Sequence, residues 1–257
     1  MLVDTHAHLY VAEFESDRLL MIERARAVGV EKIVLPNIDR ESTASMMELH
    51  AQFPSLCLPA IGLHPCSVEA GRWEQDLAEM KALLVADHPF VGIGETGLDL
   101  YWDQSTLDIQ IAALEAQCAW ALEFDLPIIL HTREATRQCI DVVKPWAAKG
   151  MRGVFHCFSG TVEEAKEVAE MGFFLGIGGV VTFKKSNLPE LVKQVPTELL
   201  VLETDSPYLA PVPYRGKRNE SAYLSLIAET LGEHLLMGPK AIAAVTTANA
   251  QRLFKRL

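Results

Sequence analysis

The alternation of short apolar runs with longer helical stretches is the feature that most constrains the fold of this chain. Eight runs rich in aliphatic and β-branched residues recur: LVDTHA, KIVLPNI, LCLPAIGLH, FVGIGET, LPIILHT, RGVFHCF, FFLGIGG and LLVLETD. Between them lie stretches with helical periodicity, such as RLLMIERARAVGV, LDIQIAALEAQCAWALEFD and VEEAKEVAEMG. In the second of these, the predicted inward stripe consists of Ile109, Ala112, Ala113, Ala116 and Trp120. Strands that alternate with helices predict βα units and a parallel sheet.

Eight βα units in 257 residues have the size of a (β/α)8 barrel of the TIM type. The alternative is an open, doubly wound sheet, which would spread the ends of its strands along one edge. A barrel instead brings the carboxyl ends of all its strands around one mouth, and polar residues follow many of the strand runs. We therefore predict an α/β fold with one barrel domain over residues 1–257. The stretch PKAIAAVTTANAQRLFKRL should form a helix outside the barrel.

Composition restricts the compartment and the kind of partner. The first residues hold no basic segment followed by an apolar one, and the longest apolar run, FFLGIGGVVTF, is too short to span a bilayer. We expect a soluble, cytoplasmic protein with no membrane partner. Five cysteines without a CxxC pair disfavour a disulfide framework or a thiolate zinc site. The net charge of −11 disfavours a broad surface for nucleic acid and favours an enzyme with a compact site.

Histidines and carboxylates follow the predicted strands at one end of the fold. His6 and His8 are separated by one residue, so both project to the same side of a strand, and imidazole is a common metal ligand. The strand ends together carry His6, His8, His64, Glu95, His131, His156 and Asp205. In a barrel these side chains converge on one mouth, which predicts a metal site there.

The number of candidate ligands exceeds the needs of one metal ion, which takes about three protein groups and a water. Six ligands suffice for two ions about 3.5–4 Å apart that share a carboxylate. These six are His6, His8, Glu95, His131, His156 and Asp205. The mixture of imidazole and carboxylate suits Zn²⁺, Mn²⁺, Fe²⁺ or Ni²⁺ better than an all-oxygen Mg²⁺ site, and the sequence does not choose among these metals.

Several ordered motifs resemble those of the TatD-type metal-dependent deoxyribonucleases, a branch of the amidohydrolase-like barrels. The motifs are DTHAHL, GLHP, GETGLD, PIILHTRE, VFHCFSG and LETDSPYL, followed by RGKRNE, and the resemblance extends to the terminal NAQRLF. It implies a TIM-type barrel that hydrolyses phosphodiesters with two metals. One metal would be held by His6, His8 and Asp205 and the other by His131 and His156, with Glu95 bridging. Ser221 departs from the pattern, because the family often has proline there.

The predicted catalytic residues are Glu95, Asp205 and His64. A water that lies between two cations becomes a usable nucleophile near neutral pH and attacks phosphorus. Asp205 is the candidate general base, and metal ligation alone is its alternative role. The resemblance places His64 beside the substrate, where it would bind phosphate or protonate the leaving oxygen. The alternative for His64 is a turn residue before Pro65.

Local positive charge would reconcile an acidic protein with an anionic substrate. Arg133 lies two residues beyond His131, and the loop YRGKRNE contributes Arg215, Lys217 and Arg218. Arginine clamps phosphate oxygens in a bidentate manner, so Arg133, Arg215 and Arg218 are the predicted substrate-binding arginines. The alternative for the loop is a solvated basic turn.

Two acidic residues are predicted to orient metal ligands. Glu203 precedes Asp205 by two positions, and Asp4 bears the same relation to His6. Asp99, in the loop after GETGL, either orients a ligand or caps the loop.

We predict a metal-dependent hydrolase that cleaves phosphodiester bonds, a deoxyribonuclease with 3′–5′ exonuclease action as one form. The first alternative is an ester or amide hydrolase, such as a D-aminoacyl-tRNA deacylase. The second is a non-catalytic metal or nucleic-acid binding protein. Tyr208 and Tyr214 either stack on bases or pack against the barrel. We expect DNA as substrate, no stable protein partner, and a monomer or weak oligomer.

Overall fold

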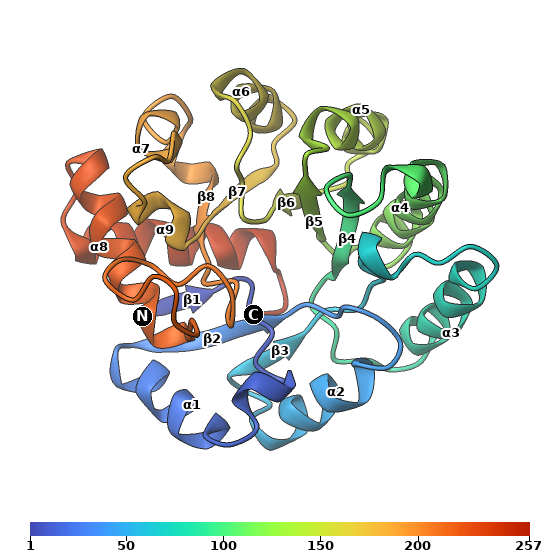
Figure 1. Ribbon diagram of the computed structural model, residues 1–257, viewed down its shortest axis with the longest axis horizontal. Coiled ribbons are helices and arrows are strands. Elements are labelled where there is room, and N and C mark those ends of the chain that lie inside the picture. Colours follow the sequence, from blue (N-terminus) through green and yellow to red (C-terminus); the bar gives the residue numbers. More distant parts are fainter.

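Eight parallel strands stand in a ring that helices surround (Figure 1). The computed structural model describes residues 1–257. The strands are β1 (Leu2–Asp4), β2 (Val30–Leu35), β3 (Cys57–Pro59), β4 (Ile93–Asp99), β5 (Ile128–Arg133), β6 (Gly153–Phe155), β7 (Phe174–Ile177) and β8 (Leu200–Leu202). Each of the eight predicted runs overlaps one strand, and the prediction of a TIM-type barrel is confirmed.

Two groups of hydrogen-bonded strands, β1-β2-β3 and β4-β5-β6-β7-β8, make up the ring. Single parallel bridges join them, Ile61 to Ile93 at one seam and Ala7 to Ser206 at the other. At the second seam the Asp205 amide donates to the His6 carbonyl at 2.9 Å. The first and last site segments of the chain are therefore held side by side by backbone hydrogen bonds.

The helices pack outside the strands and follow them in order along the chain. They are α1 (Arg18–Ala27), α2 (Thr43–Gln52), α3 (Trp73–Val85), α4 (Leu107–Glu123), α5 (Thr136–Ala147), α6 (Val162–Glu170), α7 (Leu188–Leu191), α8 (Leu224–Leu235) and α9 (Pro239–Leu253). Short 3-10 turns are η1 (Ala12–Phe14), η2 (Pro65–Ser67), η3 (Gln104–Thr106), η4 (Gly179–Thr182), η5 (Thr197–Leu199) and η6 (Ser221–Tyr223). Helix α6 begins with a capping box in which Thr161 and Glu164 satisfy each other's backbone amides.

The inward face of α4 differs from the predicted stripe. Ala113 and Trp120 are buried as expected, but Ile109, Ala112 and Ala116 are only partly buried. The buried face instead includes two glutamines, Gln110 and Gln117. Gln117 accepts from the Leu63 amide at 2.8 Å and donates to the Thr96 hydroxyl at 2.6 Å, so hydrogen bonds to β4 and to the segment after β3 help to hold this side of α4 inward.

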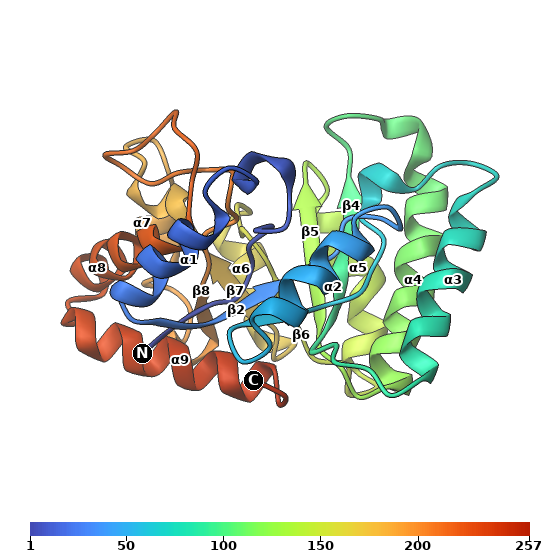
Figure 2. The same ribbon diagram turned by 90° about the horizontal axis from the view of Figure 1, so that it is seen from below.

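An apolar cluster fills the interior of the barrel toward the amino ends of the strands. Residues in every strand, or within two positions of one, contribute to it, as do α9 and the residue after it: Val3, Val34, Leu58, Ala60, Val91, Ile129, Val154, Phe174, Val201, Ala250, Leu253 and Phe254. Figure 2 shows α9 lying across this end of the barrel, opposite the long loops. The predicted outer helix is therefore confirmed.

No helix of the structure combines the length and the apolarity that a membrane crossing requires. The cytoplasmic location and the single domain over residues 1–257 stay predictions.

Candidate metal centre

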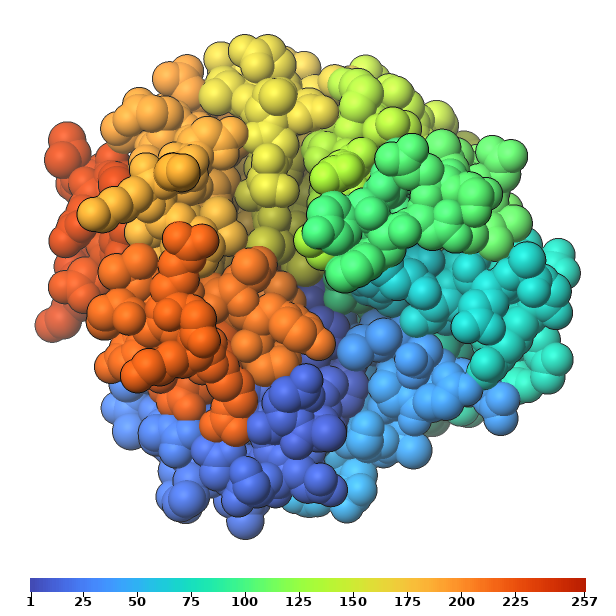
Figure 3. Space-filling model, viewed as in Figure 1, coloured from blue at the N-terminus to red at the C-terminus, as the bar shows by residue number.

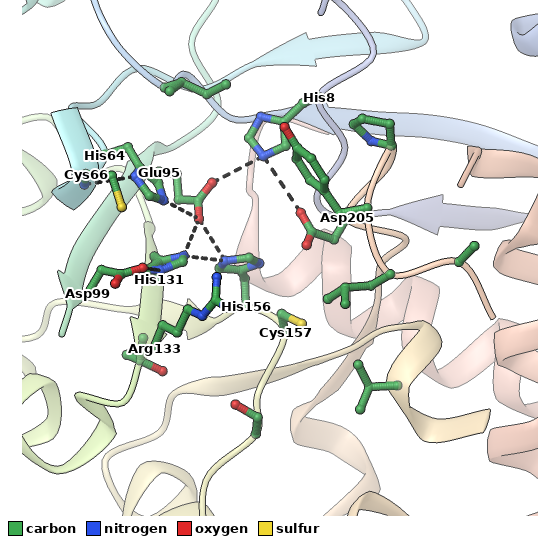
Figure 4. Close-up of a pocket in the computed structure, with 18 of the residues that line it drawn as sticks. His8, His64, Cys66, Glu95, Asp99, His131, Arg133, His156, Cys157 and Asp205 are labelled. Carbon is green, nitrogen blue, oxygen red and sulfur yellow. Dashed lines mark hydrogen bonds and ion pairs between the residues drawn. The ribbon is translucent and has the colours of Figure 1, made fainter. Parts of the chain in front are cut away.

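The Glu95 carboxylate lies at the centre of a histidine cluster at the carboxyl ends of the strands (Figure 4). Its Oε2 lies 3.1 Å from His6 Nε2 and 3.3 Å from His8 Nε2. Its Oε1 lies 2.9 Å from His131 Nδ1 and 2.8 Å from His156 Nε2. The two oxygens of a single buried carboxylate therefore face two different pairs of histidines.

Asp205 and His64 complete the cluster, one on each side of Glu95. Asp205 Oδ1 lies 3.7 Å from His6 Nε2 and 3.8 Å from His8 Nε2. His64 Nε2 lies 3.5 Å from Glu95 Oε1, on the side that His131 occupies. The structure thus brings together all seven of the strand-end residues predicted from sequence.

The backbone leaves regular strand geometry where these side chains are delivered. Glu95 lies within β4, where the pairing with β5 shifts register between Ile93 and Thr96. Asp205 follows β8 with a φ of +57°, which a non-glycine residue rarely adopts. Cys157, directly after His156, has a φ of +42° and also lines the cavity. Local irregularity rather than strand alternation aims these side chains.

Burial and charge shift the proton affinities of the cluster in opposite directions. Burial works against ionisation of Glu95, but the imidazoles of His156 and His6 outweigh it and hold its pKa well below the usual range. Burial raises the pKa of Asp205 to about 6. Burial also lowers the pKa of His6, whereas the pKa of His156 is raised because the carboxylates of Glu95 and Glu203 outweigh its burial. Such strong perturbation in one cavity is typical of a functional site.

The donor set fits divalent cations, as the hydrogen bonds around two histidines show. The Tyr10 hydroxyl donates to the Pro36 carbonyl at 2.6 Å, so it accepts from His8 Nδ1 at 3.1 Å and leaves the Nε2 lone pair facing Glu95. His131 Nε2 donates to Asp99 Oδ2 at 2.9 Å, which leaves its Nδ1 lone pair facing the same carboxylate. Imidazole lone pairs that face carboxylate oxygens are repelled by them unless a cation lies between the two.

Two acidic residues contact candidate histidine ligands or the backbone beside them. Glu203 Oε1 lies 3.5 Å from His156 Nδ1 and accepts from the Cys157 amide at 2.5 Å. Asp99 supports His131, as described, and its other oxygen caps the following turn, so both roles left open for it are fulfilled.

Asp4 reaches His6 only through the backbone, since its Oδ1 accepts from the His6 amide at 3.4 Å. The shorter contacts of Asp4 are to the Thr204 amide at 2.9 Å and the Thr204 hydroxyl at 2.7 Å. Asp4 therefore positions the segment before Asp205 rather than an imidazole ring.

The cluster lies in a cavity of about 1010 Å³ that opens at the carboxyl ends of the strands. Figure 3 shows this face hollowed near its centre, between the segments that follow β4 and β8. Arg133, Arg215 and Lys217 line the cavity, and none of them pairs with a carboxylate. Tyr208 lines it too and is half exposed.

One prediction for the basic loop does not fit the structure. Arg218 does not line the cavity, because its guanidinium donates to both oxygens of Asp17 at 2.7 Å and packs over the Phe14 ring. In the structure, Arg218 fastens the loop to the segment before α1. Of the two roles left open for Tyr214, the structure favours packing, because its ring stacks on that of Tyr223 with centroids 4.3 Å apart.

Sequence reasoning missed two features of the cavity. Tyr10, whose hydroxyl sets the tautomer of His8, was not singled out, although it lies two positions after His8. The aromatic pair Tyr101 and Trp102 was also missed, and Trp102 lines the cavity. The sequence held a signal for this pair, because two adjacent aromatic residues occur in an otherwise polar loop that follows the strand carrying Glu95.

A family model described as TatD related DNase matches residues 3–255. A protein of Bacillus subtilis named "Uncharacterized metal-dependent hydrolase YabD" is 43% identical over 256 residues, which cover 99% of each chain. The "3'-5' ssDNA/RNA exonuclease TatD" of Citrobacter rodentium is 35% identical over 257 residues, covering 98% of this chain and 97% of the other. The crystal structure of the TatD homologue YJJV from Escherichia coli superposes with a TM-score of 0.92 at 28% identity, covering 99% and 98% of the two chains.

Proposed function

The chain belongs to the TatD-related DNase family of metal-dependent hydrolases, and from this membership we propose that it removes nucleotides from the 3′ end of single-stranded nucleic acid. The position of Glu95 carries the proposal, because its two oxygens face separate histidine pairs at 2.8–3.3 Å. A carboxylate so placed suits a pair of cations. The names of the relatives do not favour the alternative of aminoacyl ester hydrolysis.

We assign one ion to His6, His8 and Asp205 and the other to His131 and His156, with Glu95 between them. Bound divalent ions supply Lewis acidity, which neutralises charge on the phosphodiester and lowers the pKa of water. The donor set of imidazole and carboxylate suits Zn²⁺, Mn²⁺, Fe²⁺ or Ni²⁺, and Mg²⁺ is the fifth candidate.

Asp205 and His64 are the groups that we assign to proton transfer. Asp205 Oδ1 lies 3.7 Å from His6 Nε2 and 3.8 Å from His8 Nε2, and from this position the carboxylate can accept the proton of the attacking water. His64 Nδ1 accepts from the Cys66 amide at 3.1 Å, so the neutral ring carries its proton on Nε2, which faces the cluster. Burial lowers the pKa of His64 and favours this neutral form, a hydrogen-bond donor for a phosphate oxygen or the leaving oxygen.

Arg133, Arg215 and Lys217 are the proposed phosphate contacts. Their charges line the cavity without carboxylate partners and so remain available to an anionic strand. The substrate is nucleic acid, and we propose a monomer or weak oligomer that works without a stable protein partner.

The test is cleavage of 5′-labelled single-stranded DNA and RNA by protein purified without chelator, with Mg²⁺ or Mn²⁺ added. We expect a ladder that shortens from the 3′ end, disappears with excess chelator and is absent in Glu95→Gln. Metal analysis should find two ions per chain in the native protein and fewer in Glu95→Gln. Release of an aminoacyl group from charged tRNA with no phosphodiester cleavage under any divalent ion would overturn the proposal.

A further inference from the structure

Two exposed aromatic rings and an arginine form a platform at the rim of the cavity. Trp102 is 70% exposed and Tyr101 is 49% exposed, and their ring centroids lie 4.9 Å apart in an edge-to-face arrangement. The Arg133 guanidinium carbon lies 3.7 Å from the Tyr101 ring centroid and 5.5 Å from that of Trp102. Trp102 and Arg133 both line the cavity that holds the candidate metal centre.

Nothing in the packing of the fold requires these rings at the surface. Neither Tyr101 nor Trp102 belongs to the hydrophobic core, and η3 and α4 begin only after them. The two adjacent exposed rings place apolar surface at the mouth of the cavity, where a ligand can cover it. Arg133 likewise has no carboxylate partner.

Asp99 ties this platform to the metal centre. One carboxylate oxygen, Oδ1, accepts from the amides of Tyr101 at 3.0 Å and Trp102 at 3.2 Å. The other, Oδ2, accepts from His131 Nε2 at 2.9 Å. Gln110 holds the Asp99 backbone from both sides, accepting at 2.8 Å and donating at 3.1 Å. The rings are therefore held at a defined position relative to a candidate metal ligand, as a preorganised binding site requires.

We propose that Trp102, with Tyr101 and Arg133, forms a subsite that stacks on one unpaired nucleobase of the strand whose phosphate is at the metal centre. This inference rests on the proposed function. Stacking on an aromatic face accepts any base, because every base has a π-face, and a charged guanidinium beside it adds attraction. A base paired and stacked in a duplex does not present that face, so the subsite selects single strands.

Figure 2 shows the loop after β4, which carries the platform, and the loop after β8 rising on the same side of the barrel. In the second loop, the Arg215 guanidinium lies 4.3 Å from the Phe183 ring. A nucleic-acid strand that passes over the candidate metal centre between these loops would contact the platform on one side and Arg215 with Lys217 on the other. This arrangement orients the phosphodiester between a stacked base and cationic groups.

Steady-state kinetics of three variants, Trp102→Ala, Trp102→Leu and Trp102→Phe, tests the subsite on single-stranded DNA and on methyl p-nitrophenyl phosphate. Loss of one base–aromatic stacking contact raises KM for DNA by roughly fivefold to 150-fold, and we expect this rise for Trp102→Ala and Trp102→Leu. Trp102→Phe should restore most of the affinity, and turnover of the small diester should stay unchanged in all three. Equal KM values in all variants and the native protein would overturn the proposal.

Trp146→Ala is the matched control, because Trp146 lies on α5 with the Lys149 ammonium 4.3 Å from its ring and outside the cavity. Its KM for DNA should match that of the native protein. Abasic substitution along the oligonucleotide should find one position at which the effect of Trp102→Ala disappears. The absence of any such position would contradict stacking on a particular base.

Tryptophan fluorescence during titration with oligonucleotide in chelator separates this inference from the proposed function. The native protein should be quenched on binding, and Trp102→Phe should lose that quenching. If the native protein binds with Trp102 quenched yet never cleaves nucleic acid, the nuclease proposal fails and the subsite stands. If it cleaves but Trp102 is not quenched, the subsite is overturned and the nuclease proposal stands.

Discussion

The Ser221 hydroxyl donates a hydrogen bond of 2.7 Å to Asp4 Oδ2, although the two residues lie 217 positions apart in the chain. Both are fully buried, and Asp4 also accepts from Thr204 at the end of β8. Ser221 stands where the family that the sequence resembles often has proline, and a proline has no hydroxyl to offer. The departure from the motif therefore supplies a donor to a buried carboxylate beside the site.

The stability of the protein should depend on pH through Asp4. Burial raises the pKa of Asp4 to about 7, despite hydrogen bonds from Thr204 and Ser221 that lower it, whereas an exposed aspartate has a pKa of 3.8. The folded state therefore holds a proton that the unfolded chain releases. This contribution to stability is complete below pH 3.8 and is lost as pH rises through about 7.

Asp4→Asn should remove this dependence, because an amide does not ionise. The free energy of unfolding of the variant, relative to the native protein, should rise by about 2 kcal/mol between pH 5 and pH 8. Urea unfolding of both proteins in the presence of chelator measures this difference in free energy. The other titratable groups are the same in the two proteins, so their contributions cancel. Parallel pH profiles would show that Asp4 is ionised in the folded protein at both ends of this range.

Removal of the central carboxylates should abolish activity and leave the fold intact. Glu95→Ala and Asp205→Ala alter the carboxyl end of the barrel, while the apolar cluster that includes Ile129, Val201 and Phe254 lies toward the other end. We expect kcat for a phosphodiester to fall by about 10²- to 10⁴-fold or more. Circular dichroism and thermal unfolding provide the control, and loss of the folded spectrum in either variant contradicts this placement.

Arg218 and Asp17 should be coupled in stability rather than in substrate binding. The pKa of Asp17 is lowered to about 2 because Arg218 and Arg24 donate to its carboxylate. Since the pair is partly exposed, a double-mutant cycle of Asp17→Asn and Arg218→Ala should give a coupling of about 1 kcal/mol.

A lowered carboxylate pKa contributes stability above the unfolded value, and that stability is lost only as pH falls through the folded value of about 2. The coupling should therefore be the same at pH 5 and at pH 8. Arg218→Ala should also leave the salt dependence of KM unchanged. A weaker salt dependence of KM in this variant would contradict the prediction and indicate that Arg218 contacts phosphate.

Lys217, in contrast, should contribute to the salt dependence of DNA binding. Lys217 lines the cavity and pairs with no carboxylate. Each phosphate contact to a single strand adds about 0.7 to the slope of log affinity against log salt concentration, so Lys217→Ala should lower that slope by about this amount. Lys193→Ala is the control, because Lys193 pairs with Glu190 at 2.8 Å and lies outside the cavity. An equal slope in both variants speaks against a phosphate contact by Lys217.

The sequence by itself determined the barrel and the membership of the candidate site. The eight apolar runs set the strands, and because parallel strands in a closed barrel end around one mouth, side chains such as His6, Glu95 and Asp205 had to meet. That inference needs only the position of a residue relative to its own strand, which local periodicity carries.

Only the tertiary structure decided which groups face each other. Arg218 and Asp17 are 201 positions apart, and the loop geometry, not the pattern RGKRNE, directs this guanidinium away from the cavity. The same holds for Asp99, which joins His131 to the turn of Trp102, and for the inward face of α4. Charges and hydrogen bonds act over a few ångströms in space, so their partners depend on how distant segments are packed, and no local period in the sequence records that.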